Sequence, residues 1–291
     1  MQWGASSRLQ SFWDARAACN FIGGGTGCGL LLWAAIGLNT SLPYFPAALI
    51  GLLFVAAGLF MVWLEIGKPW RAFNLFFRPQ TSWMTREGMV ALPLFAAGTI
   101  AVLFDADVQL GLELPSPFIP AMITALLGLT FLYCQVQIMH SARGLPAWRA
   151  SWVMPLLGVS GLTEGLGVYL LVMAFLGTVP TYVQMAAIAL VIARAVAWYA
   201  YLSALARSGA PESTTAALSR ASAGFLTIGH ALPLLFLALG FIAPGMAIPV
   251  AALAGIAATL GGWFLKINLV TKAAYIPKFT IPAAPVRGQT G

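Results

Sequence analysis

The sequence has very little charge. Of its 291 residues, only 8% are Asp, Glu, Lys or Arg, whereas 60% are hydrophobic. An average soluble domain carries roughly 25% charged residues, so this chain lacks the polar side chains needed to cover a water-exposed globule of its size. The sequence therefore predicts an integral membrane protein. It excludes a soluble enzyme, a disordered chain and, despite the net charge of +7, a nucleic-acid-binding protein.

Cysteine and histidine are also scarce. Cys19, Cys28 and Cys134 are scattered and form no CxxC pair, which excludes the known ligand spacings of iron–sulfur clusters. The only histidines are His140 and His230, so a haem b with two axial histidines would need both at one depth on facing helices. We therefore expect no haem, iron–sulfur cluster or other metal in this chain, and we expect His230 in an interhelical hydrogen bond.

Apolar stretches of about 20 residues are typical of membrane-spanning helices. The sequence predicts eight of them, and an all-α bundle follows because an open sheet leaves unpaired backbone groups in lipid. We expect two four-helix halves, residues 1–150 and 151–271, followed by a C-terminal tail, 272–291. The predicted spans are residues 17–38, 44–65, 87–104, 118–139, 152–177, 181–204, 222–242 and 246–267.

Basic residues occur on only one side of these spans. Fourteen of the fifteen lie in the terminal segments and in the loops after the second, fourth and sixth spans: Arg8, Arg16, Lys68, Arg71, Arg78, Arg86, Arg143, Arg149, Arg207, Arg220, Lys266, Lys272, Lys278 and Arg287. The other connections hold no basic residue and three acids, Asp105, Asp107 and Glu113. The positive-inside rule then predicts that both termini and the three long loops are cytoplasmic.

A glycine pattern occurs twice. Gly-x3-Gly-x-Gly begins at Gly23 in the first span and again at Gly161 in the fifth, an offset of 138 residues. An offset of four spans preserves orientation, so a duplication would make a parallel repeat of two halves. The alternative is that the spacing of small residues only lets membrane helices approach closely. Under both interpretations the glycines are close-packing positions.

Ionisable residues inside a membrane are functional candidates by default. Glu164 in the fifth span and Arg194 in the sixth lie roughly 18 and 15 Å from the cytoplasmic ends, at ~1.5 Å per residue. Adjacent antiparallel helices could place them side by side as an ion pair. The pair would either hold the helices of the bundle together or form part of a proton relay. The relay would include His230, at a depth of roughly 12 Å.

The loop after the second span is the densest polar cluster in the sequence. Glu65 ends one helix and Glu87 begins the next, so both carboxylates are expected half desolvated at the cytoplasmic interface, where they suit proton exchange. Aromatic side chains there can flank a flat quinone ring. The alternative is an ordinary interfacial loop.

We expect a quinone headgroup site bounded by the first four spans. Glu65, Glu87 and His140 would exchange protons there. The residues expected to bind the headgroup are Asn20, Arg71, Trp83 and Gln137. The loop 66–86 would form the docking face for a partner, and the tail after Lys272 would lie against the bundle or a partner.

This loop resembles the anchor subunits of the NrfD/DmsC-type family of complex iron–sulfur molybdoenzymes. The resemblance rests on residues 66–72 (Ile-Gly-Lys-Pro-Trp-Arg-Ala), on residues 82–87 (Ser through Glu), on the glycine-rich stretch 20–27, on the eight spans and on chain length. Residues 13–21 are most similar to the anchors of phenylacetyl-CoA:acceptor oxidoreductases, and next to sulfite-dehydrogenase anchors.

The resemblance implies a haem-free subunit that exchanges electrons between membrane quinone and a partner's iron–sulfur cluster. It carries over an acid–base residue at Glu65, where the DmsC-like pattern has His, and a carboxylate at Glu87. With the predicted orientation, an iron–sulfur subunit and a molybdopterin catalytic subunit would lie on the cytoplasmic side of the inner membrane. By analogy the reaction is quinone reduction, and the chain alone is not expected to act on the soluble substrate. The alternatives are a secondary transporter with a midplane Glu/Arg site and a haem b cytochrome subunit.

Overall fold

The computed structural model describes residues 7–40, 42–65, 70, 74, 76–110 and 114–277, without the side chains of 107–110. Within these residues, eight helical segments are long and apolar enough to cross a membrane, which confirms the predicted fold class. They are α1 (Ala15–Leu38), α2 (Phe45–Glu65), α3 (Trp83–Leu110), α4 (Phe118–His140), α6 (Val153–Phe175), α7 (Thr181–Arg207), the segment Glu212–Ile242 and α10 (Ala247–Thr271).

The segment Glu212–Ile242 is continuous but not uniform. It comprises α8 (Glu212–Leu226), the π-helical segment η2 (Thr227–Ala231) and α9 (Leu232–Ile242). A 3-10 turn, η3 (Pro244–Met246), leads into α10. The helix therefore begins ten residues before the predicted start at 222. The polar residues of α8 lower its hydropathy, but its buried face, which includes Ala217, Leu218 and Ala221, still packs on the bundle.

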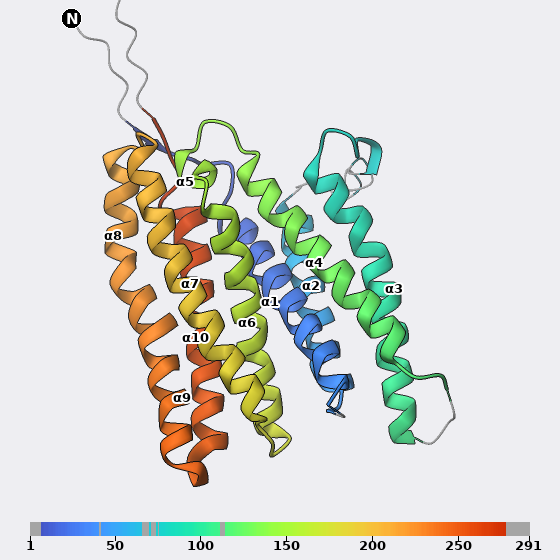
Figure 1. The fold of residues 1–291 in the computed structure, drawn as a ribbon. Helices are drawn as coiled ribbons and strands as arrows, with labels where there is room; N and C mark the ends of the chain where they lie inside the picture. Colours follow the sequence, from blue (N-terminus) through green and yellow to red (C-terminus); the bar gives the residue numbers. More distant parts are fainter. Residues whose placement is uncertain are drawn as a thin grey trace, which may run out of the picture.

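Helix α1 lies in the middle of the bundle, between α2, α4 and α6 (Figure 1). Its contact with α6 is made by glycines: a Cβ added at Gly161 would lie 3.2 Å from the Cα of Gly25, and one added at Gly29 would overlap the carbonyl of Gly161. The glycine pattern is therefore a close-packing pattern. Thr26 and Glu164, which are 138 residues apart, are hydrogen-bonded to each other. The same 138-residue offset separates the two copies of the glycine pattern, so this contact is consistent with a duplication of two halves. The duplication itself stays a prediction.

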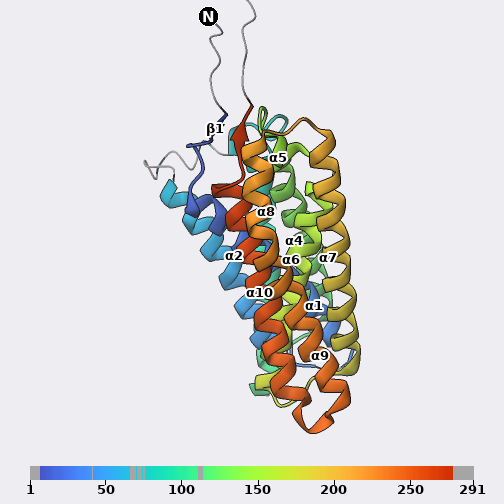
Figure 2. The ribbon, with the colours of Figure 1, turned by 90° about the vertical axis from the view of Figure 1, so that its left-hand side faces the viewer.

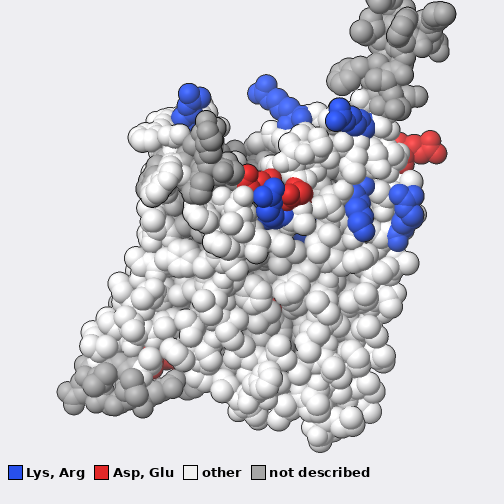
Figure 3. Space-filling model, turned by 180° about the vertical axis from the view of Figure 1, so that it is seen from behind, with Lys and Arg blue, Asp and Glu red and all other residues white. Residues whose placement is uncertain are grey.

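The described parts of both termini lie at the same end of the bundle (Figures 1 and 2). There β1 (Arg8–Leu9) pairs antiparallel with β2 (Tyr275–Ile276), and the short helix α5 (Pro146–Arg149) lies in the loop after α4. Figure 3 shows that exposed Lys and Arg side chains gather at this end, while most of the visible face below carries no charge. We call this end, with the loops after α2, α4 and α7, the basic end.

A cluster at the basic end ties the termini to the bundle. The side chain of Gln10 donates hydrogen bonds to the carbonyls of Trp13 (2.7 Å) and Val270 (3.0 Å). The Trp13 ring stacks on Trp148 at 4.7 Å, and the Trp148 indole donates to the Leu269 carbonyl. In the tail, Ala273 and Ala274 are buried and β2 contacts α5, so the tail lies against the bundle as far as Ile276. Residues 278–291 lie outside the described range.

Two charged residues do not lie where the sequence places them. Lys266, counted among the basic residues of the terminal segment, is buried within α10. Asp105, expected in a connection, is a buried residue of α3, and its carboxylate accepts hydrogen bonds from the backbone N–H groups of Tyr44 (3.0 Å) and Phe45 (2.6 Å). Asp105 thus caps the start of α2, because the first N–H groups of a helix lack partners within it.

Candidate functional site

Three buried polar side chains from three helices meet near the basic end. Asn20 of α1, Glu87 of α3 and Gln135 of α4 are 5%, 4% and 1% exposed. The Gln135 amide nitrogen donates to the backbone carbonyl of Asn20 at 2.9 Å, and both amide side chains interact with the Glu87 carboxyl. Gly24 makes room for this arrangement, because a Cβ there would overlap the Gln135 amide. We call Asn20, Glu87 and Gln135 the Glu87 cluster.

The Glu87 cluster contains unsatisfied atoms. Asn20 Oδ1, Glu87 Oε1 and Gln135 Oε1 are buried, and none has a hydrogen-bond partner within the described part of the chain. Buried polar atoms in folded proteins are nearly always hydrogen-bonded to protein or ordered water. Three such atoms in one place therefore indicate a site for a ligand or for water.

Two sequence predictions about this cluster need correction. Glu87 is buried rather than half desolvated, because α3 begins at Trp83 and carries Glu87 one turn into the bundle. Gln135, not the predicted Gln137, contributes the amide of α4. Residues two apart on a helix point about 200° apart, so Gln137 turns outward and donates to the hydroxyl of Tyr133 at 2.8 Å.

Trp83 lies at the start of α3 beside aromatic and cationic groups. The Arg86 guanidinium carbon lies 4.1 Å from the centre of the Trp83 ring, and the Tyr133 ring meets Trp83 edge-on at 5.6 Å. Arg86 also donates to the backbone carbonyls of Pro79 and Gln80, which fastens the end of the loop to α3. Trp83 is thus held at the start of the helix that carries Glu87.

The remaining predicted site residues do not join the Glu87 cluster. Glu65 is half-buried at the end of α2 and lies near Arg16, which donates to the neighbouring Leu64 carbonyl at 3.1 Å. Arg16 also holds the pKa of the exposed Asp14 carboxyl below its usual range through hydrogen bonds. His140 ends α4, and its Nδ1 is buried without a partner in the described residues. Arg71 lies outside the described residues.

Within the described residues, Glu164 and Arg194 form no direct salt bridge, although their charges still interact. The Glu164 carboxylate pairs instead with Lys266, at 2.7 Å from Nζ to Oε2, and also accepts a hydrogen bond from the Thr26 hydroxyl at 2.7 Å. Lys266 Nζ donates further to the Phe21 carbonyl at 2.9 Å. Lys266 lies near the end of the last span in the sequence, but its long side chain reaches inward to the glycine gap at Gly25.

Arg194 is fully buried and bound mainly by backbone carbonyls. It donates to Ala258 O at 2.9 Å, to Gly229 O, and through Nε to His230 Nε2 at 3.4 Å. Because His230 Nε2 accepts this bond, the ring's Nδ1–H donates to Phe225 O at 3.1 Å. The Gly229 carbonyl lies in η2, where a π-helical turn changes the usual helix bonding.

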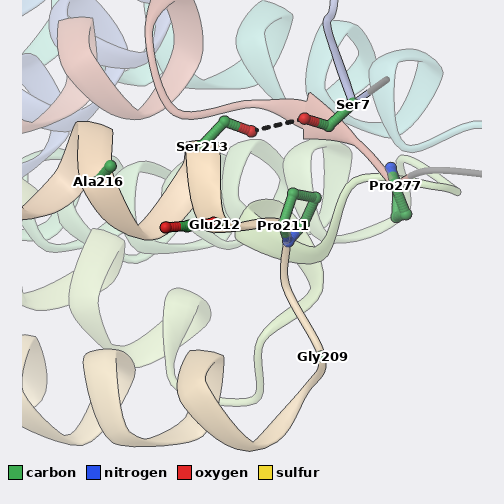
Figure 4. Close-up of a pocket in the computed structure, with 7 residues that line it drawn as sticks. All are labelled: Ser7, Gly209, Pro211, Glu212, Ser213, Ala216 and Pro277. Carbon is green, nitrogen blue, oxygen red and sulfur yellow. Dashed lines mark hydrogen bonds between the residues drawn. The ribbon is translucent and has the colours of Figure 1, made fainter. Parts of the chain in front are cut away.

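Two hollows lie elsewhere in the described part of the chain, and neither is lined by Asn20, Glu87 or Gln135. A cavity of about 630 Å³ lies at the basic end, where the N-terminal segment meets the start of α8, and the Ser7 and Ser213 hydroxyls are 2.9 Å apart in it (Figure 4). A second groove of about 350 Å³, between α4 and α6, is lined almost wholly by apolar side chains, with Tyr133 at its edge. Among the described residues, no group of three or more His, Cys, Asp and Glu is placed to hold a metal ion.

These features define a multi-pass membrane protein whose exposed charges and buried acceptor cluster lie toward one end of the bundle. Residues 43–218 match the family described as the DMSO reductase anchor subunit (DmsC). Because the match spans more than half of the 291 residues, the chain belongs to this family of membrane anchor subunits of molybdoenzyme complexes. A comparison with curated proteins finds no match.

Proposed function

We propose that this anchor subunit exchanges electrons between membrane quinone and an iron–sulfur cluster of a partner subunit. The quinone headgroup would bind at the Glu87 cluster. The observation that supports this site is the convergence of three buried, unpartnered oxygen atoms from α1, α3 and α4. These three oxygens accept hydrogen bonds from donors, such as ordered water or the hydroxyl groups of a reduced headgroup, whereas the carbonyl oxygens of a quinone would need a donor such as protonated Glu87.

Quinone chemistry also needs protons, and the site offers carriers for them. Interconversion of quinone and quinol moves two electrons and two protons. Glu87 lies inside the cluster and can exchange a proton with the headgroup. Glu65 and His140, at the ends of α2 and α4, would connect the site to water. Trp83, at the start of α3, would close the site together with Arg71 of the loop.

The proposed partners bind at the basic end. Its exposed arginines and lysine can align an acidic partner surface, and they are Arg8, Arg16, Arg78, Arg143, Arg149, Arg207, Arg220 and Lys272. By the positive-inside rule this end is cytoplasmic in the inner membrane. An iron–sulfur subunit would dock there with a molybdopterin catalytic subunit, as in the phenylacetyl-CoA:acceptor oxidoreductases, and the electrons would reduce quinone.

The test is electron transfer in the assembled complex carrying Glu87→Gln. General acid–base groups typically contribute 10²–10⁴-fold to a rate, so quinone reduction should fall by roughly 10²-fold. Reduction of a soluble dye by the partner subunits should not change. Glu212→Gln is the matched control, because Glu212 is exposed at the same end. Wild-type quinone reduction in both Glu87→Gln and His140→Ala, with normal assembly, would remove the reason for placing the site here.

One observation favours secondary transport as a second candidate function. The ion pair of Glu164 and Lys266 is buried among the spans, where transporters place their binding sites. Purification from native membranes separates the two functions. An electron-transfer anchor should be recovered with molybdenum and iron–sulfur partners, whereas a transporter should be recovered alone.

A further inference from the structure

A third hollow, of about 220 Å³, lies between α8 and α10 at the basic end. It is lined by three residues of α8 and three at the end of α10, namely Ala217, Arg220, Ala221, Phe264, Asn268 and Lys272. Arg220 and Lys272 are exposed, and no acidic residue lines the hollow. Within the described residues, neither of these two side chains forms an ion pair or a hydrogen bond. The hollow therefore carries two cations without a counter-ion from the described chain.

The polarity of the hollow changes with depth. Phe264, Asn268 and Lys272 are four residues apart, so they form one row along α10, and Lys272 lies nearest to the basic end. On α8, which begins at the basic end, Gly224 lies one turn deeper than Arg220. A Cβ added at Gly224 would lie 3.3 Å from the Phe264 ring. The hollow thus has a cationic rim and an aromatic floor, with an amide between them.

Exposed apolar side chains continue both rows toward the middle of the bundle. Leu260 lies one turn deeper than Phe264, and Ile228 lies one turn deeper than Gly224; both side chains are exposed. They belong to the last two segments that are long and apolar enough to cross a membrane, so these side chains face the acyl chains of lipid. The hollow therefore lies where this apolar surface meets the charged end of the bundle.

A phospholipid has the same order of polarity, because a phosphate is followed by ester groups and then by acyl chains. Guanidinium and ammonium groups bind phosphate through charge-assisted hydrogen bonds, and basic pockets between spanning helices bind anionic headgroups. Asn268 donates one amide N–H to the Phe264 carbonyl at 2.7 Å, and its second N–H can donate to an ester oxygen. We propose that this hollow binds an anionic phospholipid. Its phosphate lies between Arg220 and Lys272, and one of its acyl chains lies over Phe264.

A lipid uses more of the hollow than other anions would. Free phosphate or an acidic protein surface could pair with Arg220 and Lys272, but neither would cover the aromatic floor or the exposed Leu260 and Ile228 below it. The two cations then hold a lipid, and the other exposed cations of the basic end remain for a partner subunit. This inference does not depend on the proposed exchange of electrons with quinone.

The test is native mass spectrometry of the purified assembled complex, titrated with phosphatidylglycerol or with phosphatidylcholine of the same acyl chains. We expect one phosphatidylglycerol molecule to bind at least tenfold more tightly than phosphatidylcholine. Arg220→Gln and Lys272→Gln should each weaken phosphatidylglycerol binding about fivefold, and the double variant should weaken it roughly 25-fold. The matched control is the double variant Arg143→Gln with Arg207→Gln, because both residues are exposed cations of the basic end outside this hollow.

Four outcomes would show that the proposal is wrong. In the first, the two lipids bind equally well, so the site does not recognise the anionic headgroup. In the second, the Arg220 and Lys272 double variant binds phosphatidylglycerol as tightly as the control does. In the third, excess inorganic phosphate displaces the lipid, which would make the hollow a site for a soluble anion. In the fourth, the isolated subunit binds phosphatidylglycerol but the assembled complex does not, which would show that a partner subunit covers the hollow.

Discussion

The ion pair of Glu164 and Lys266 can be tested by removing its members singly and together. Lys266→Met removes the ammonium group and leaves the buried Glu164 carboxylate with one described side-chain donor, the Thr26 hydroxyl. Glu164→Gln leaves the Lys266 ammonium with the Phe21 carbonyl and a neutral amide. The double variant removes both charges and keeps side chains of similar volume.

The expected free energies follow from burial. Removing one partner of a buried pair costs about 3–5 kcal/mol, whereas replacing both partners by neutral groups of similar volume is often neutral or stabilising. Each single variant should therefore lose about 3–5 kcal/mol of unfolding free energy. The double variant should lie close to the wild type, so the two single effects should be strongly non-additive.

The assay is reversible unfolding of the purified subunit in mixed micelles, followed by tryptophan fluorescence. The exposed Glu212→Gln should stay within about 0.5 kcal/mol of the wild type. If Lys266→Met is as stable as the wild type, or if the double variant loses the sum of the single losses, the two residues do not stabilise the fold as a pair. If Glu164→Gln assembles normally and loses only proton-coupled turnover, the residue is a relay rather than a structural partner.

Three further predictions concern other parts of the bundle. Gly24→Ala should displace the Gln135 amide and weaken quinone binding at least tenfold. Gly158→Ala should leave quinone binding unchanged, because a Cβ at Gly158 meets open space. Equal effects of the two variants in a binding titration would contradict this prediction. Arg194→Lys keeps the positive charge but removes the guanidinium N–H groups that donate to two backbone carbonyls. The unfolding free energy should therefore fall by about 1–3 kcal/mol. An unchanged unfolding curve would show that these hydrogen bonds do not stabilise the fold. A cysteine at Ser208 should be labelled by a membrane-impermeant maleimide only in inside-out vesicles, and one at Gly245 only in right-side-out vesicles. The reverse result would show that the basic end is not cytoplasmic.

Membrane insertion and helix count were determined by the sequence alone. The shortage of charge and the apolar stretches of about 20 residues predict the spanning helices because lipid imposes these requirements on each segment by itself. The basic residues all lie on one side of the predicted spans, and by the positive-inside rule this predicts that both termini share one end. The described parts of the termini do lie at the same end (Figure 1). The glycine pattern was likewise readable as close packing, since only small residues let two helix backbones approach.

The partners of the buried polar groups were decided only by the tertiary structure. A depth count along each helix places Glu164 near Arg194, but it does not show which faces of the two helices meet. Lys266 reaches Glu164 through the gap at Gly25, and Gln135 rather than Gln137 points toward α1. Such contacts depend on helix rotation and on gaps contributed by other helices far away in the sequence, so no local pattern along the chain encodes them.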